Sequence, residues 1–162
     1  MPKTFKAVIA ALAVIILAAA AYNYFAFSDE RRVQRALIDL REKISTPVAG
    51  GLDTVRVAAT LKPLFAPEVD ISFQRGGELR RNFDRDELLR VIIGIKQRNP
   101  ELSVKLDFSR RNIKITEDRS ATVSVHVAVE NLGEPFESRR LIFAFEKNEE
   151  ARWQLARIFQ DD

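Results

Sequence analysis

Residues 82–95 read NFDRDELLRVIIGI, and this stretch contains the clearest helix start in the chain. Asp84 is a good N-cap, and Glu87 stands three residues later, as in a capping box. Phe83 and Leu88 can form a hydrophobic staple across the same helix start. Apolar side chains then follow over a wide arc, which is typical of a helix covered by a sheet. The stretch therefore predicts a helix packed against a β-sheet.

After this helix the apolar period changes from 3.6 residues to two, which indicates strands. Alternation over 104–108 continues at 113–115 with its parity reversed. A strand cannot keep one apolar face through such a change, so we expect a β-bulge near Arg110 or Arg111. Further alternating strands are predicted at 123–129, 141–145 and 153–159.

The residues before 82 predict two helices and a pair of strands. Ser28 can cap a helix that runs to about Ile44, and Asp53 opens a second, shorter helix. Alternation at 69–73 predicts a strand, with 78–83 as its partner. Helices in the first half followed by long strands in the second half are the pattern of an α+β domain.

An uncharged stretch of 21 residues runs from Ala7 to Phe27. As a helix it would span about 30 Å, the thickness of the hydrocarbon core of a bilayer. We therefore divide the chain into an N-terminal transmembrane anchor or signal segment, 1–27, and an α+β domain, 28–162. A cleaved signal with small residues at 19–21, and a buried helix of a soluble protein, are the alternatives. The residues that mark the anchor are Ala7, Ile15, Ile16, Leu17 and Phe27.

The charges that flank this stretch give opposing indications of membrane orientation. Arg31, Arg32 and Arg35 follow it, whereas Lys3 and Lys6 precede it, and this count favours a cytoplasmic domain. A tail of six residues before an apolar segment is, in contrast, the ordinary form of an exported signal or signal-anchor. We expect a single-pass protein of a bacterial inner (cytoplasmic) membrane, with a periplasmic, extracytoplasmic domain.

Composition excludes several classes of chemistry. The chain has no cysteine, which removes disulfides and thiolate metal sites, and one histidine is too few for an imidazole metal site. We expect no metal and no cofactor. The formal charge of +3 comes from interleaved acids and bases, so no nucleic-acid partner is predicted. Arginine pairs at 80–81, 110–111 and 139–140 favour an ordinary charged sheet face over an anion or lipid-headgroup surface.

Three stretches carry a resemblance to a known family: LFAPEVDISF at 64–73, NFDRDELLRVIIGI at 82–95 and RWQLARIFQ at 152–160. With the order of elements between them, they make residues 29–160 resemble the nuclear transport factor 2-like superfamily, which includes SnoaL-like and cystatin-like domains. The resemblance implies a cone in which three helices pack on a curved, bulged, mainly antiparallel sheet. Members include ketosteroid isomerases, scytalone dehydratases, SnoaL-like cyclases and binding domains without activity, so the fold does not choose the function.

The acid–base residues of the family's enzymes are not matched at the corresponding positions. Ketosteroid isomerases carry a general-base Asp just after the first strand and a Tyr in the oxyanion hole. Here residues 73–75 read FQR at the first of these positions, and no Tyr follows Tyr24. We therefore assign no catalytic residue. The candidates kept for an enzymatic alternative are Asp70, Asp107 and His126, and strand alternation places Asp70 and His126 on the solvent face.

The sequence thus predicts a non-catalytic domain, tethered to the lipid bilayer through residues 7–27, that binds a partner protein or an apolar ligand. A partner, or a second copy in a homodimer, would use the outer sheet face with Ser124, His126, Ala128, Ile142 and Ala144. An apolar ligand would use an incompletely filled cone. The alternatives are a SnoaL-like isomerase, dehydratase or cyclase, and a cleaved periplasmic carrier of a hydrophobic molecule. The ligand-pocket candidates are Phe65, Phe73, Phe108, Phe143 and Trp153.

Overall fold

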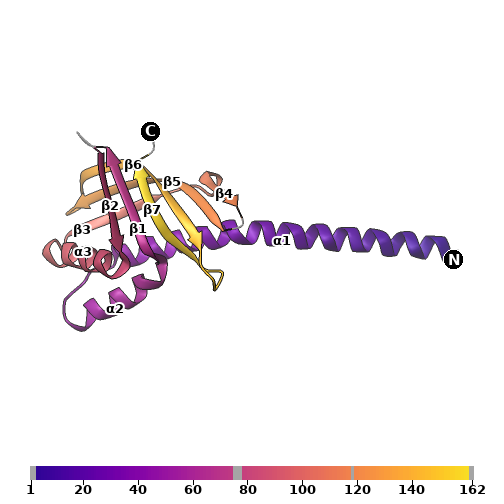
Figure 1. The fold of residues 1–162 in the computed structure, drawn as a ribbon, viewed down its shortest axis with the longest axis horizontal. Helices are drawn as coiled ribbons and strands as arrows, with labels where there is room; N and C mark the ends of the chain where they lie inside the picture. The colour runs from indigo at the N-terminus through magenta and orange to yellow at the C-terminus, as the bar shows by residue number, and fades with distance from the viewer. Residues whose placement is uncertain (1–2, 75–77, 118, 161–162) are drawn as a thin grey trace.

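The computed structural model describes the backbone of residues 3–74, 78–117 and 119–160, and the side chains of residues 13–20, 29–73, 80–117 and 119–160. Its first element is one continuous helix, α1 (Lys3–Ser45), whose N-terminal half extends away from the sheet as a rod (Figure 1). The predicted helix start at Ser28 is wrong, because the backbone is helical on both sides of it. The cause is local: neither Gly nor Pro occurs between residues 3 and 45, and the stretch is rich in Ala and Leu, which favour helix.

The rest of the chain forms a seven-stranded sheet with two further helices, which confirms the α+β class. The sheet has the order β2-β1-β7-β6-β5-β3, and β4 also pairs with β5. All pairings are antiparallel except that of β1 with β7. The bounds are α2 (Leu52–Leu61), η1 (Lys62–Leu64), β1 (Phe65–Gln74), β2 (Glu78–Asp84), α3 (Arg85–Arg98), β3 (Leu102–Asp107), η2 (Arg110–Asn112), β4 (Ile113–Glu117), β5 (Ser120–Asn131), β6 (Glu134–Lys147) and β7 (Trp153–Gln160).

Helix α3 is confirmed, although its start is built differently from a capping box. The Asp84 carboxylate accepts a hydrogen bond from the backbone N–H of Asp86 at 2.8 Å, so Asp84 is the N-cap. Glu87 does not reach back to Asp84; its carboxylate pairs with the Arg81 guanidinium at 2.7 Å. The buried side chains of α3 include Leu88 and Leu89, which pack against the sheet.

The parity reversal after Phe108 is real, but the predicted bulge near Arg110 or Arg111 is wrong. A single turn of 3₁₀ helix, η2, interrupts the chain there and separates β3 from β4. Both strands pair with the same neighbour, β5, on either side of that turn. The turn restores the inward phase, because Leu106 before it and Ile113 after it are both buried. A complete turn of 3₁₀ helix thus produces the change of parity that we expected from the single inserted residue of a bulge.

One apolar cluster fills the space between the helices and the inner sheet face. Three of the predicted pocket residues belong to its buried part: Phe65, Phe143 and Trp153 are 2, 4 and 5% exposed. Phe73 and Phe108 are partly buried and pack against the same cluster. All five predicted pocket residues thus belong to the apolar cluster or pack against it.

The C-terminal end of α1 is fixed to the sheet and to α3. The Ser45 hydroxyl donates to the carbonyl of Val104 in β3 at 2.9 Å. The ammonium group of Lys96 in α3 donates to the carbonyl of Ile44, one of the last carbonyls of α1. Burial lowers the pKa of Lys96, since a low-dielectric environment disfavours the charged form.

Candidate functional site

The outer sheet face carries a polar depression built from β3, β5 and β6. Asp107 and His126 are direct antiparallel partners in the register, and His126 is also the partner of Arg140. Alternation places these three side chains outward, opposite the fully buried Val123 and Val125. They line a cavity of about 490 Å³ together with Phe108, Ser109, Asn112 and Ser124.

The chemistry available in this depression is acid–base or hydrogen-bonding chemistry. A carboxylate beside an imidazole can orient the ring or move a proton. Asp107 and His126 are nonetheless exposed, so water competes for both groups. The depression also lies on the opposite sheet face from the apolar cone. Its composition therefore suits recognition of a polar surface at least as well as catalysis.

Asp70 lies in a different part of the sheet. It sits on β1, which β7 and β6 separate from β5, and its carboxylate pairs with the guanidinium of Arg80 at 3.0 Å. A separate cavity of about 250 Å³ holds this pair. The structure thus brings two of the three candidate catalytic residues, Asp107 and His126, together and leaves Asp70 apart.

The predicted partner surface on the outer sheet face needs one correction. Ala144 is 3% exposed and cannot contribute contact area. The cause is a register shift between Ala144 and Phe145, which leaves three consecutive residues of β6 buried. Ser124, Ala128 and Ile142 are partly exposed, and His126 is exposed.

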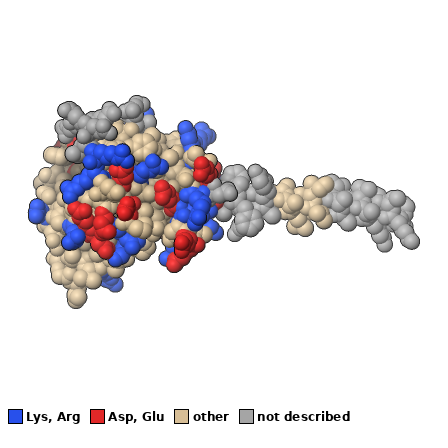
Figure 2. Space-filling view, in the orientation of Figure 1, with Lys and Arg blue, Asp and Glu red and all other residues tan. Residues whose placement is uncertain are grey.

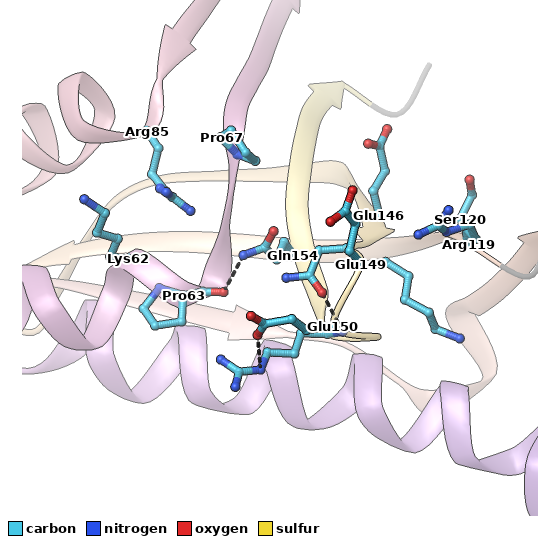
Figure 3. Close-up of a pocket in the computed structure, with 13 residues that line it drawn as sticks. Lys62, Pro63, Pro67, Arg85, Arg119, Ser120, Glu146, Glu149, Glu150 and Gln154 are labelled. Atoms are coloured by element: carbon cyan, nitrogen blue, oxygen red, sulfur yellow. Dashed lines mark hydrogen bonds and ion pairs between the residues drawn. The ribbon is translucent and has the colours of Figure 1, made fainter.

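A larger groove of about 910 Å³ lies near the β6–β7 turn, and the sequence did not indicate it (Figure 3). Lys62 and Arg85 lie at one end of it and Arg119 at the other. Its charges are mixed and partly satisfied: Lys62 pairs with Asp86 at 2.8 Å, and the Gln154 amide donates to the carbonyl of Pro63 at 3.0 Å. The lining comes from five separate segments, so no local motif could have predicted it. The lining residues are Lys62, Pro63, Pro67, Arg85, Arg119, Ser120, Glu146, Lys147, Asn148, Glu149, Glu150, Arg152 and Gln154.

Lys and Arg are interspersed with Asp and Glu on the domain face in view (Figure 2). Several of these charges form ion pairs, for example Lys105 with Glu130 at 2.7 Å across β3 and β5. This pattern agrees with the expectation of an ordinary charged surface rather than a basic patch. Among the described residues, no three His, Asp or Glu side chains gather as a metal site would require.

The point where α1 meets the domain is held by two acidic residues. The Asp29 carboxylate accepts from the Lys147 ammonium at 3.0 Å and from the Trp153 indole N–H at 3.4 Å. Lys147 also lies over the Trp153 ring, 5.0 Å from its centroid. One residue later, Glu30 pairs with Arg110 of η2 at 3.4 Å. The first acids after the apolar stretch therefore attach α1 directly to the sheet.

The N-terminal half of α1 carries four consecutive apolar side chains that no other element covers. Val14, Ile15, Ile16 and Leu17 are 63 to 69% exposed. The predicted anchor residues Ala7 and Phe27 lie outside the residues whose side chains are described. Within the part of the chain whose side chains are described, the structure holds no helix that is both long and apolar enough for a membrane span.

The domain is a curved mixed sheet closed by helices. Its elements follow in the order helix, helix, strand pair, helix and long strands. This architecture can be compared with solved structures. A protein described as NTF-2 like and of unknown function from Shewanella oneidensis MR-1 matches with a TM-score of 0.57 at 14% identity, covering 82% of this chain and 98% of that one. The domain has the nuclear transport factor 2-like fold. This confirms the fold that the resemblance implied for residues 29–160.

Two further solved structures show how widely this fold is used. A putative dehydratase of the NTF2-like family from Streptomyces avermitilis matches with a TM-score of 0.55 at 18% identity, covering 83% of this chain and 95% of that one. A protein of unknown function with a cystatin-like fold from Nostoc punctiforme matches with a TM-score of 0.56 at 11% identity, covering 81% and 88%. No protein-family model matches the chain, and no curated protein matches it. The likeness is therefore one of fold.

Proposed function

We propose that the chain is a single-pass membrane protein whose nuclear transport factor 2-like domain binds a partner protein close to the bilayer surface. The observation that carries the proposal is the exposure of Val14 to Leu17 on a helix that continues without a break into the domain core. Four neighbouring apolar side chains in water are unfavourable, by about 25 cal/mol for each Å² of apolar surface. Acyl chains of a bilayer would cover them.

The lengths of the segments fit this arrangement. Residues 7–27 would span the hydrocarbon core at about 1.5 Å per residue. Asp29 and Glu30, the first charged residues after that stretch, are bonded to Lys147, Trp153 and Arg110 of the domain. Because no linker intervenes, the domain would lie against the membrane surface with its direction set by α1.

Binding of a partner protein is favoured over catalysis and over carriage of an apolar ligand. On the inner sheet face, three of the pocket candidates, Phe65, Phe143 and Trp153, are at most 5% exposed and pack in the core. An apolar ligand of ordinary size needs a cavity of about 300 Å³ or more lined by such residues. For localisation we propose the inner membrane, with the domain on the extracytoplasmic side.

Extraction of cell membranes at alkaline pH tests the anchor. Full-length protein should stay in the membrane pellet after carbonate treatment. The matched variant carries Ile16→Arg and Leu17→Arg, each costing about 2.5–3.5 kcal/mol at the centre of a span, and it should move to the supernatant. Release of the unchanged protein by carbonate would rule out an integral anchor. Native mass spectrometry of the pellet protein in mild detergent then reports a bound partner, a second copy or a trimmed N-terminus.

One observation favours a second candidate function, an isomerase, dehydratase or cyclase. Asp107 and His126 are cross-strand partners in one 490 Å³ depression, where the imidazole could act as a base oriented by the carboxylate. If so, turnover of an enolisable ketone should fall by at least 100-fold in His126→Gln and Asp107→Asn, and should be unchanged in Asp70→Asn. Equal rates in all three variants would end this alternative.

A further inference from the structure

Among the described side chains outside α1, the exposed large apolar ones gather on α2, α3 and the β5–β6 hairpin. On α2, Leu52 and Val55 are 89 and 67% exposed; on α3, Val91 and Ile95 are 40 and 50% exposed. Figure 1 places both helices at the end of the domain remote from the N-terminal half of α1. If α1 spans the bilayer, this end is turned away from the membrane and is open to other proteins. The remaining two side chains of the set, Leu132 and Phe136, lie on the hairpin.

The two helices form one surface, because they lie side by side and antiparallel. The Gln97 amide near the end of α3 donates to the Thr54 hydroxyl near the start of α2 at 3.0 Å. At the other end, Lys62, just after α2, pairs with Asp86 in the first turn of α3 at 2.8 Å. On α3, Val91 and Ile95 are four residues apart and share a face.

The same spacing puts Leu52, Val55 and Ala59 along the outer face of α2, where all three are exposed. The outer faces of the two helices therefore form two apolar stripes that lie side by side. We use the name distal face for Leu52, Val55, Ala59, Val91, Gly94 and Ile95.

Gly94 stands between the two apolar residues of α3, in the interior of the helix. A glycine there costs about 1 kcal/mol relative to alanine. A Cβ at this position would meet nothing within 4 Å, so packing within the domain does not require the glycine. A small residue at this point lets another backbone approach the helix closely. Gly94 thus indicates a close neighbour that the domain itself does not supply.

The charged residues on these two helices indicate which charges a binding partner would carry. Arg56 on α2 and Arg98 on α3 are exposed and have no hydrogen bond or ion pair among the described residues. Arg90 is also exposed and donates to the backbone carbonyl of Asp86 at 3.3 Å. The acids Asp86 and Glu87 at the start of α3 already pair with Lys62 and Arg81. Asp53 is the acid that remains on the two helices, so the unpaired charges of α2 and α3 are mostly basic.

We propose that the distal face docks an amphipathic helix of a partner protein, with an apolar stripe over Val55 and Val91 and acidic residues along its flanks. Apolar anchors at helical spacing are a recurring mode by which a protein surface recognises an amphipathic helix. Basic residues at the rim would steer an acidic partner and reject a basic one. The proposal rests on the partner-binding half of the proposed function and is independent of the anchor.

Designed peptides serve as the probe. The first is an 18-residue helix with Leu at every third or fourth position and Glu on both flanks; the second has Lys in place of each Glu; the third is a scrambled Glu peptide. Fluorescence anisotropy with full-length protein in mild detergent should show saturable binding of the Glu peptide, about tenfold tighter than the Lys peptide, and none of the scrambled one.

Three variants locate the binding. Val55→Gln with Val91→Gln should weaken the Glu peptide at least tenfold, and Arg56→Glu with Arg98→Glu should reverse the preference toward the Lys peptide. Arg35→Gln, at an exposed position of α1 that belongs to neither candidate surface, is the matched control and should change nothing. Trp153 emission verifies folding in each variant.

Two results would overturn the proposal. One is no saturable binding, or binding of both charged peptides alike. The other is binding that a separate Arg140→Gln substitution on the outer sheet face weakens and the helix variants leave unchanged, which would assign partner binding to the sheet face instead. If the protein binds no peptide but stays in the carbonate pellet, the proposed docking at the distal face is refuted and the proposed membrane anchor is not.

Discussion

Replacing Asp29 by Ala tests the junction between α1 and the sheet. The substitution removes the acceptor of two hydrogen bonds, one from Lys147 at 3.0 Å and one from the Trp153 indole at 3.4 Å. Trp153 is the only tryptophan in the chain and is 5% exposed, so its emission reports directly on this contact. The variant should unfold more easily and should emit at longer wavelength in the folded state.

The magnitude follows from the burial of the three groups. The Lys147 and Asp29 side chains are 17 and 22% exposed, so their charged hydrogen bond is partly screened and contributes about 1 kcal/mol. Loss of the carboxylate leaves the buried indole N–H without its partner, which costs about 1 kcal/mol more for a bond of this length. We expect the free energy of unfolding to fall by about 2 kcal/mol.

The measurement is equilibrium unfolding of full-length protein in mild detergent, followed by Trp153 fluorescence. Asp39→Ala is the matched control, since Asp39 lies on the same helix, is partly exposed and has no bond among the described residues. It gains the same helix propensity without losing a contact. A double-mutant cycle with Lys147→Met isolates the ion pair. If Asp29→Ala lowers the free energy of unfolding by less than about 0.5 kcal/mol and leaves the emission unchanged, the contact of Asp29 with Lys147 and Trp153 does not hold α1 to the sheet.

Three further predictions concern the fold. Leu132 has φ 53° as the first residue of a two-residue hairpin turn, so Leu132→Asn should raise the free energy of unfolding by about 1 kcal/mol in urea titrations; a loss would contradict the turn. Phe145→Ala, at 1% exposure, should lower it by about 3–5 kcal/mol, measured the same way, and a loss under 1 kcal/mol would place Phe145 outside the core. A hydrogen bond from Lys62 lowers the pKa of Asp86, so this pair stabilises the fold above the ordinary carboxyl pKa and loses that effect as pH falls through the folded-state pKa. Carboxyl NMR titration should show the Asp86 pKa rising in Lys62→Met; no change would mean that Lys62 is not the cause.

Sequence patterns predicted the structure correctly where the pattern lies within a single helix or strand. The Asp84 cap and the apolar arc behind it predicted α3 because both act within one helix. Alternation likewise predicted that Val123 and Val125 face inward. Ser28 failed as a helix start because a cap needs a break in the chain, and the neighbours of Ser28 are all compatible with helix.

Features that depend on partners far apart in the chain could not be predicted. The parallel pairing of β1 with β7 joins Phe65 to Leu155, and no local pattern encodes it. The meeting of Asp107 with His126 depends on the register between β3 and β5, which the turn η2 helps to set. The contact of Asp29 with Trp153 joins residues that lie 124 positions apart, so no local pattern around Asp29 could indicate it.

The most direct test of the membrane-tethered domain is the accessibility of a spin label on α1 in a lipid bilayer. The chain has no cysteine, so a single label can be placed by Leu17→Cys, with Glu149→Cys in the exposed β6–β7 turn as the control. In reconstituted bilayers we predict that the label at residue 17 collides with dissolved oxygen and is shielded from a water-soluble nickel complex, and that the label at residue 149 behaves in the opposite way. Equal access of the nickel complex to both labels would contradict the membrane anchor.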